Sequence, residues 1–417
     1  MNNKALAAKV RELVTSGFSL KLGEPTHKGA PNKVWQSAVA AGSELWFDTG
    51  DLEEAAKVWT AEFSGLTTNN SLLNKEIQKG IYDQLIRAST AALRATDANI
   101  SERDLLLETA FILNAHHALR LVQTFDAHVS VELHTDLAND VERTVSYGKR
   151  YFEICPERFF VKVPLTPAGL ISARRLGEAG VPINFTLGYS ARQNYLIALF
   201  SQTSYVNVFM GRLNSFVADS KLGDGQNVGE KATLATAREI IALRKAGKSK
   251  TKLIGASIRS GDQVAAVAGV DVLTIPTKAA AEFAAKGEPA RSHVQEDPHV
   301  TLADGVKMSD FGGAALWEVS DQFKAATDAL LKKDTATLTP EKLQEHFASA
   351  EIPDFLPRWS EDDLQTITKD GKIPNYSTWK ARLASGQVGL DALMNISGLC
   401  AFTVDQAALD NRVRSLL

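Results

Sequence analysis

Short apolar runs typical of β-strands alternate with helical patterns through the first two thirds of this 417-residue chain. The candidate strands are 44–49, 64–68, 128–134, 158–164, 183–188, 205–210, 252–257 and 271–276. Strands that alternate with helices build parallel sheets, because each parallel pair needs a crossover connection. An open doubly wound sheet has the same local pattern, but eight such units favour a closed (β/α)8 TIM barrel.

Helix signals fill the segments between these runs. One helix is predicted by apolar residues at four-residue intervals, namely Leu73, Ile77, Ile81 and Leu85. Thr166 followed by Pro167 is typical of a helix start. Glycines that mark expected helix ends lie shortly before the next strand, at Gly180, Gly247 and Gly269. The crossovers 69–127 and 211–251 are long, so we expect extra helices in both.

The sequence pattern changes after residue 280, where the alternation of strands and helices ends. A polar stretch that includes EPARSHVQEDPH precedes helical patterns, with helix starts expected at Thr339-Pro340 and at Ser360. We therefore divide the chain into an N-terminal helical segment (1–43), the barrel (44–280) and a helical C-terminal extension packed on the barrel (281–417).

Composition excludes several classes of function. The net charge of −3 is nearly balanced, which argues against nucleic acid or an anionic membrane as a partner. The two cysteines, Cys155 and Cys400, form no CxxC pair, so the sequence suggests neither a zinc site nor a disulfide framework. No uninterrupted apolar run reaches the length of a membrane span, and the first residues lack a signal-peptide pattern. We expect a cytoplasmic protein.

Polar residues stand at the carboxyl ends of several predicted strands, where barrel enzymes carry their chemistry. They are Asp48, Asn69, Glu132, Lys162, Asn184, Thr186, Ser257 and Arg259. Each alone has a plain structural explanation, such as a turn cap for Asp48, a loop hydrogen bond for Asn69 or a surface ion pair for Arg259. Six strand ends with polar groups are harder to explain in this way.

Lys162 lies in the middle of the buried run FFVKVPLT. Its stem could be packed with its head reaching the surface, but burial inside a barrel would disfavour the ammonium form. A neutral amine can attack a ketone and form a Schiff base, which then accepts electrons as an adjacent C–C bond breaks. Such chemistry needs carboxyl groups for proton transfer, and Asp48 and Glu132 could supply them.

The strand-end motifs resemble those of the transaldolase family. The resemblance is carried, in order, by FDTGDLEE, GLTTNNSLL, VSVELHTDLAND, VKVPLTPAGL, INFTLGYSARQ, VFMGRLN and GASIRS. It covers roughly 44–280, and the final FTVDQAALDNRVRSLL resembles the closing helix of the family. The resemblance implies transfer of a dihydroxyacetone unit from a ketose phosphate, sedoheptulose 7-phosphate or fructose 6-phosphate, to an aldose phosphate. It further implies the pentose phosphate pathway, a homodimer, and neither cofactor nor metal.

The resemblance also implies residue roles. Lys162 would be the Schiff-base nucleophile, Asp48 the acid/base for C–C cleavage, and Glu132 with Thr186 would hold the catalytic water. Substrate hydroxyls and phosphate would be bound by the remaining set, namely Asn69, Asn184, Asn207, Phe209, Arg212, Ser257 and Arg259. Arg212 and Arg259 would form the charge-assisted hydrogen bonds to the phosphate.

Three departures from the family pattern stand out. Asn70 replaces the proline expected after Asn69, Asn207 replaces a serine at the phosphate site, and residues 335–395 lie outside the resemblance. Fructose 6-phosphate aldolases, which release free dihydroxyacetone, are similar in fold but tend to have glutamine for Glu132 and tyrosine for Phe209. A non-catalytic sugar-phosphate-binding barrel is a further alternative.

Two histidine positions complete the candidates. The adjacent pair His116-His117 lies in a helical pattern, where neighbours face different ways, so a metal pair is not expected. His134 follows the strand of Glu132 and could line the mouth of the site.

Overall fold

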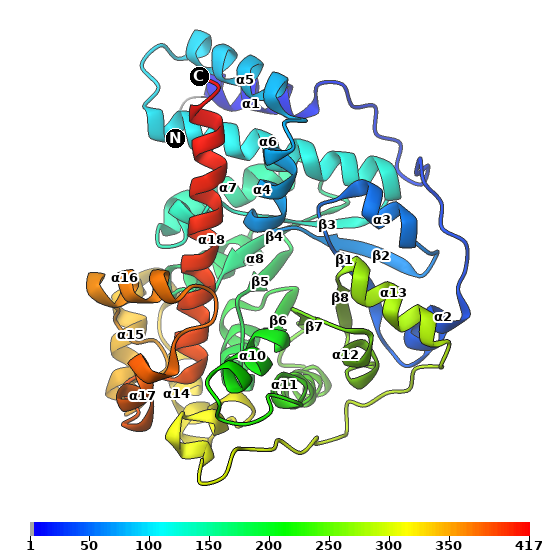
Figure 1. Ribbon diagram of the computed structural model, residues 1–417. Helices are drawn as coiled ribbons and strands as arrows, with labels where there is room; N and C mark the ends of the chain where they lie inside the picture. The colour runs from blue at the N-terminus through cyan, green and yellow to red at the C-terminus, as the bar shows by residue number, and fades with distance from the viewer. Residues whose placement is uncertain (1–3) are drawn as a thin grey trace.

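The computed structural model describes residues 4–417 and contains a closed parallel barrel whose strands follow the chain order (Figure 1). The strands are β1 (Glu44–Asp48), β2 (Phe63–Thr67), β3 (His128–Glu132), β4 (Phe159–Pro164), β5 (Ile183–Thr186), β6 (Tyr205–Phe209), β7 (Lys252–Ala256) and β8 (Val272–Ile275). Each lies within two residues of its predicted bounds at both ends. Since β8 pairs with β1, the sheet is closed and the open doubly wound alternative is excluded.

Helices surround the barrel. They are α3 (Leu52–Val58), α4 (Asn70–Gln78), α5 (Asp83–Thr96), α6 (Glu102–Phe125), α7 (Val141–Ile154), α8 (Pro167–Glu178), α9 (Ala191–Leu196), α10 (Met210–Asp219), α11 (Val228–Lys245), α12 (Gly261–Ala266) and α13 (Thr277–Lys286). Both long crossovers contain extra helices, as expected. The single helix predicted from Leu73 to Leu85 is wrong, because the chain breaks at Gly80 (φ +78°) and leaves Ile81 51% exposed.

The remaining helices lie before and after the barrel. The predicted N-terminal segment contains α1 (Lys4–Thr15) and α2 (Lys33–Ala40), and its first three residues lie outside the described part of the chain. The C-terminal region contains α14 (Asp321–Leu331), α15 (Pro340–Ser349), α16 (Glu361–Asp370), α17 (Tyr376–Ala384) and α18 (Leu390–Arg414). The predicted helix starts are confirmed, because the side chains of Thr339 and Ser360 accept backbone hydrogen bonds at the starts of α15 and α16.

The barrel interior is apolar at one end and polar at the other. Residues two apart on a strand point the same way, so each strand contributes to successive layers. The floor is aromatic, with Trp46 stacked on Phe160 (ring centroids 5.6 Å apart) and edge-on to Tyr205 (5.0 Å). Asp48 and Lys162 stand two residues beyond Trp46 and Phe160 on the same strands. The strand alternation that directs the aromatic rings inward therefore also directs these two polar groups into the mouth of the barrel.

Helix α18 crosses the carboxyl end of the barrel, from the extension to α4, α5 and α6 (Figure 1, red). At its start, Asp391 accepts two hydrogen bonds from Arg192, at 2.8 and 2.7 Å, and one from Ser190 at 2.7 Å. Near its other end, Arg412 donates to Asp83 and Arg414 to Glu102. Its 25 residues span about 37 Å, enough to tie opposite sides of the barrel together.

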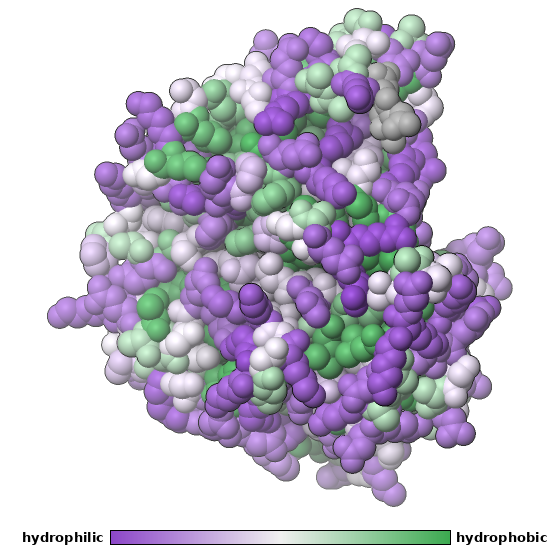
Figure 2. Space-filling model, turned by 180° about the vertical axis from the view of Figure 1, so that it is seen from behind, coloured by the Kyte–Doolittle hydropathy of each residue, from purple (hydrophilic) through white to green (hydrophobic). Residues whose placement is uncertain are grey.

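The face of the protein seen in Figure 2 is mostly hydrophilic, and the long apolar helix α18 is partly buried. From behind, hydrophilic side chains cover most of the surface, and apolar ones gather in smaller areas between them (Figure 2). Within residues 4–417, α18 alone is long and apolar enough to cross a membrane by length and composition. Half of its most apolar window is buried inside the protein, and a core helix of this kind passes the same test.

We expect Asp391→Ala to destabilise the fold by about 3–5 kcal/mol, because it leaves the buried Arg192 guanidinium with one carboxylate fewer. Chemical denaturation of the full chain measures the change. The matched control is Glu345→Gln, which removes an ion pair to Arg358 whose side chains are both more than half exposed, and should cost about 0–1 kcal/mol. Equal losses in the two variants would contradict the anchoring role of Asp391.

Candidate active site

The barrel places Lys162 beside Glu132 in its interior. The two residues are register partners on β4 and β3, and side chains of register partners point to the same face. Lys162 Nζ lies 3.9 Å from Glu132 Oε2 and donates a 2.9 Å hydrogen bond to the Thr68 carbonyl. Lys162 is 4% exposed and Glu132 is 3% exposed. The lysine predicted to be buried is therefore buried, next to one of the two predicted carboxyl groups.

Asp48 is the second carboxyl group at this end of the barrel. It ends β1, is half-buried, and accepts a 2.9 Å hydrogen bond from Thr67 Oγ1. Burial raises the pKa of Asp48, and the positive charge of Lys162 opposes that shift more strongly than those of Arg259 and Arg212. Asp48 thus shares one electrostatic environment with the lysine and with both predicted phosphate ligands.

Glu132 has the clearest proton-transfer character. Burial raises its pKa to about 7, against the opposing effects of the Lys162 charge and of the Asn70 backbone N–H, which donates to its carboxylate. Proline has no N–H, so the residue that departs from the family pattern at position 70 makes this hydrogen bond possible. A carboxyl group with a pKa near neutrality can both accept and return a proton under working conditions.

Several buried polar atoms at this end of the barrel have no hydrogen-bond partner in the protein. They are Glu132 Oε2, Thr186 Oγ1, Asn70 Nδ2 and Ser257 Oγ. Buried polar atoms without partners are rare in folded proteins and are usually satisfied by water or ligand. Thr186 is two residues beyond Asn184 on β5, so both face the interior with Lys162. The set is suited to holding a water molecule or a substrate hydroxyl.

The predicted asparagines lie at the site but differ in how many of their side-chain amide atoms already form hydrogen bonds within the protein. Asn69 caps α4, with its side-chain oxygen accepting from Leu72 N at 2.9 Å, so its NH2 group stays available. Asn184 donates to Ser130 Oγ at 3.0 Å and accepts from Asn207 Nδ2 at 3.2 Å. Asn207 also accepts from Gly188 N at 3.4 Å. The geometry therefore makes Asn207 part of the barrel wall, and its substrate contact stays a prediction.

Arg212 is a buried guanidinium held without a carboxylate. It stands in the first turn of α10 and is 7% exposed. Its guanidinium lies between the rings of Phe209 and Phe402, 5.4 and 5.5 Å from their centroids. Among residues 4–417, it donates one hydrogen bond, from Nη1 to Tyr189 Oη at 3.2 Å, and forms no ion pair. A buried cation without a counterion is costly, so this geometry favours an anionic ligand.

Arg259 lies next to Arg212. A side chain at Gly211 would place its Cβ 2.7 Å from Arg259 Cγ and 3.0 Å from Nε, so the glycine lets the arginine pass directly beside α10. Partial burial, followed by repulsion from Arg212, lowers the pKa of Arg259. Ser257 precedes it in a left-handed conformation (φ +59°), a strain of about 1–3 kcal/mol that is typical of functional sites.

Helix α18 closes the site from above. A Cβ on Gly398 would lie 2.7 Å from Leu187 Cδ2, 2.9 Å from Arg212 Nη1 and 3.1 Å from Tyr189 Oη. The Asn395 amide, one turn earlier, donates to the Leu187 carbonyl at 3.0 Å. The absence of a side chain at position 398 therefore lets the helix lie directly on the guanidinium.

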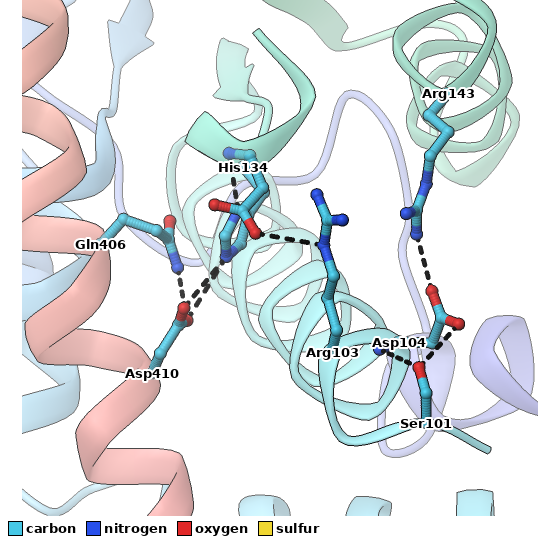
Figure 3. A network of polar contacts seen from close by, with 8 residues as sticks. Ser101, Arg103, Asp104, His134, Arg143, Gln406 and Asp410 are labelled. Atoms are coloured by element: carbon cyan, nitrogen blue, oxygen red, sulfur yellow. Dashed lines mark hydrogen bonds and ion pairs between the residues drawn. The ribbon is translucent and has the colours of Figure 1, made fainter. Parts of the chain in front are cut away.

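His134 anchors α18. Figure 3 shows the ring directed at Asp410, whose carboxylate is 3.3 Å from Nε2 and also accepts from Gln406 at 2.9 Å. The other ring nitrogen accepts from the Asp136 backbone N–H at 3.1 Å. With both nitrogens bonded to protein groups and 8% of its surface exposed, His134 is occupied in holding α18 and is not free to serve the mouth of the site.

Some residues of the site had no usable sequence signal. Tyr189 lies in the motif INFTLGYSARQ, but only the fold shows its hydroxyl on Arg212. Gly398 and Phe402 lie far along the chain, in a helix whose position over the barrel depends on tertiary contacts. Among residues 4–417, no three His, Cys, Asp or Glu side chains are grouped as metal ligands would be.

Sequence comparisons agree with this geometry. A sequence model of the transaldolase/fructose-6-phosphate aldolase family matches residues 45–345, beyond the predicted end of the barrel at 280. A probable transaldolase of Thermus thermophilus is 32% identical over 237 residues, which is 56% of this chain and 86% of that protein. Transaldolases of Xanthomonas campestris and Prochlorococcus marinus are each 28% identical, over 55% of this chain and 71% and 70% of theirs. The chain is therefore an enzyme that belongs to the transaldolase/fructose-6-phosphate aldolase family.

Proposed function

We propose that this enzyme transfers a dihydroxyacetone unit from a ketose phosphate to an aldose phosphate through a Schiff base on Lys162. The observation that carries the proposal is the Lys162 amine inside the barrel, 3.9 Å from Glu132 and electrostatically coupled to Asp48. Relatives named transaldolase support the same assignment. Sedoheptulose 7-phosphate and fructose 6-phosphate are the donors to test first.

The first half of the reaction breaks a C–C bond. The Lys162 amine attacks the C2 carbonyl of the ketose to give a carbinolamine, which loses water to form an iminium. Asp48 removes the proton of the C4 hydroxyl as the C3–C4 bond breaks, and the bonding electrons move toward the iminium nitrogen. An aldose phosphate leaves, and a three-carbon enamine stays on Lys162.

The second half reverses these steps on another aldehyde. The enamine carbon attacks the acceptor carbonyl, and the new alkoxide takes back the proton held by Asp48. Water then attacks the iminium and releases Lys162. Glu132, with its pKa near neutrality, is suited to moving protons to and from this water, which Thr186 Oγ1 would help to hold.

The lyase alternative differs in the fate of the enamine. Protonation instead of attack on an acceptor would release free dihydroxyacetone. Glu132 and Phe209, the residues at which the resemblance separates the two activities, both favour transfer here. The non-catalytic alternative uses only Arg212 and Arg259, and is less well supported because the interior polar set around Lys162 has no role in it. Membership of the pentose phosphate pathway, a dimeric state and a cytoplasmic location stay predictions.

Reduction with borohydride in the presence of fructose 6-phosphate should trap a three-carbon adduct on Lys162, because borohydride reduces the iminium to a stable amine. Peptide mass spectrometry locates the adduct. Lys252, an exposed lysine at the start of β7, serves as the internal control and should stay unmodified. No adduct on Lys162 under turnover conditions would remove the mechanism. Free dihydroxyacetone produced without an acceptor would instead indicate the lyase.

The kcat/KM of the wild-type enzyme should rise with pH through a limb centred near 7, because burial holds the pKa of Glu132 at about 7 and only its ionised form accepts a proton. Glu132→Gln should lower kcat about 100-fold or more and remove this limb. Steady-state rates measured across the pH range provide the test. Glu153→Gln, at an exposed glutamate of α7, is the control and should keep the limb. A limb at the same pH in Glu132→Gln would assign it to another group.

Gly398→Ala should raise KM for a phosphorylated donor about tenfold, because the new methyl group would displace Arg212 Nη1 and Tyr189 Oη. Alanine favours a helix interior by about 1 kcal/mol, so thermal unfolding should show a folded protein. Val404→Ala, at a position of α18 that is 53% exposed, is the control. Unchanged KM in Gly398→Ala would show that the guanidinium does not bind substrate in the position seen here.

A further inference from the structure

The loop between α16 and α17 lies near two helices of the predicted phosphate site, α18 and α10. It contains Lys372 and is held at both ends, since Thr368 of α16 hydrogen-bonds Cys400 of α18 and the Tyr376 ring packs edge-on against Phe216 of α10 (centroids 6.3 Å apart). Phe216 is one helical turn from Arg212. The two anchors therefore place the loop between α18 and α10, the two helices that enclose the guanidinium.

Lys372 joins a group of cations without carboxylate partners. Its side chain is exposed, and it feels the positive charges of Arg259, Arg212 and Lys75 of α4. Partial burial, followed by these charges, lowers the pKa of Lys372, and the negative charge of Asp405 opposes the shift. Asp405 is itself hydrogen-bonded by Ser71 Oγ. Within the described residues 4–417, none of these four cations forms an ion pair.

Like charges repel, so a group of this kind is unfavourable unless a ligand neutralises it. A phosphate monoester carries close to two negative charges and three acceptor oxygens. Two arginines balance that charge, but each oxygen can accept more than one hydrogen bond, so acceptor positions stay open for a third cation. The loop comes from residues outside the family match, which ends at residue 345. The extra cation is thus a property of this chain's C-terminal region and not of the barrel.

We propose that Lys372 is a third cationic ligand of the substrate phosphate, brought to the site by the C-terminal extension. It closes the phosphate end of the site opposite Lys162 and selects phosphorylated donors and acceptors over neutral sugars. Lys75 of α4 adds to the same positive field. The inference rests on the proposed function, because it assigns Arg212 and Arg259 to the same phosphate.

Binding of inorganic phosphate to the full-length protein, measured by calorimetry at low ionic strength, tests the proposal without turnover. Lys372→Ala should weaken binding about three- to tenfold, and Lys372→Arg should restore most of it. Lys369→Ala removes another exposed lysine of the same extension and should change binding less than twofold. Lys372→Glu, which reverses the charge, should weaken binding further than Lys372→Ala.

Kinetics give a second readout. Lys372→Ala should raise KM for glyceraldehyde 3-phosphate as acceptor, while KM for glyceraldehyde and kcat for both stay close to wild type. Phosphate affinity that is unchanged in Lys372→Ala, or equally reduced in Lys369→Ala, would overturn the proposal. An absent borohydride adduct on Lys162 combined with Lys372-dependent phosphate binding would instead remove the proposed chemistry and leave the anion site standing.

Discussion

The arrangement of the site depends on an ionisable pair inside a closed sheet. Lys162 and Glu132 lie 3.9 Å apart, each with less than a twentieth of its surface exposed, in a region where water cannot solvate either charge. Burial of this kind costs free energy, which the Thr68 carbonyl, the Asn70 N–H and the mutual attraction only partly offset. The closed barrel supplies the remaining stability, since every strand pairs on both sides. The same loss of solvation raises the pKa of Glu132 close to neutrality. At such a pKa the carboxyl group can both accept and donate a proton.

Under the proposed function, binding and chemistry would be divided between two regions of the same face. Lys162, Glu132 and Asp48 belong to the first half of the barrel, whereas Arg212 and Arg259 follow strands of the second half. A ketose phosphate has its carbonyl at one end and its phosphate at the other, so under the proposed function this separation would orient an extended substrate. The positive charges of Arg212 and Arg259 also act on Asp48 across the mouth of the barrel and oppose the rise of its pKa that burial causes. Substrate phosphate, once bound, would therefore change the environment of the carboxyl group that has to accept a proton.

Most of the barrel and its polar strand ends could be predicted from the sequence, because strand alternation fixes which side chains point inward. Lys162, Glu132 and Asn184 follow from that rule, and their register pairing agrees with it. What depends on tertiary packing could not be predicted: the break at Gly80, the hydrogen bond between His134 and Asp410, and the contact of Gly398 with Arg212. These contacts join segments that are remote in the chain, so no local sequence pattern indicates them. Asn207 shows the converse case, since its place was predicted but its amide is used within the barrel wall.

Helix α18 has a consequence for the order in which this enzyme can become competent. All eight strands precede it in the chain, so a nascent polypeptide can close its sheet and bury Lys162 before the helix has been synthesised. Phe402 and the close approach at Gly398 are then still missing, and one side of Arg212 faces water. Under the proposed function, a barrel that forms this early would hold the reactive amine before the phosphate site around Arg212 is complete. Docking of α18 would then be a late step of maturation, separate from formation of the barrel.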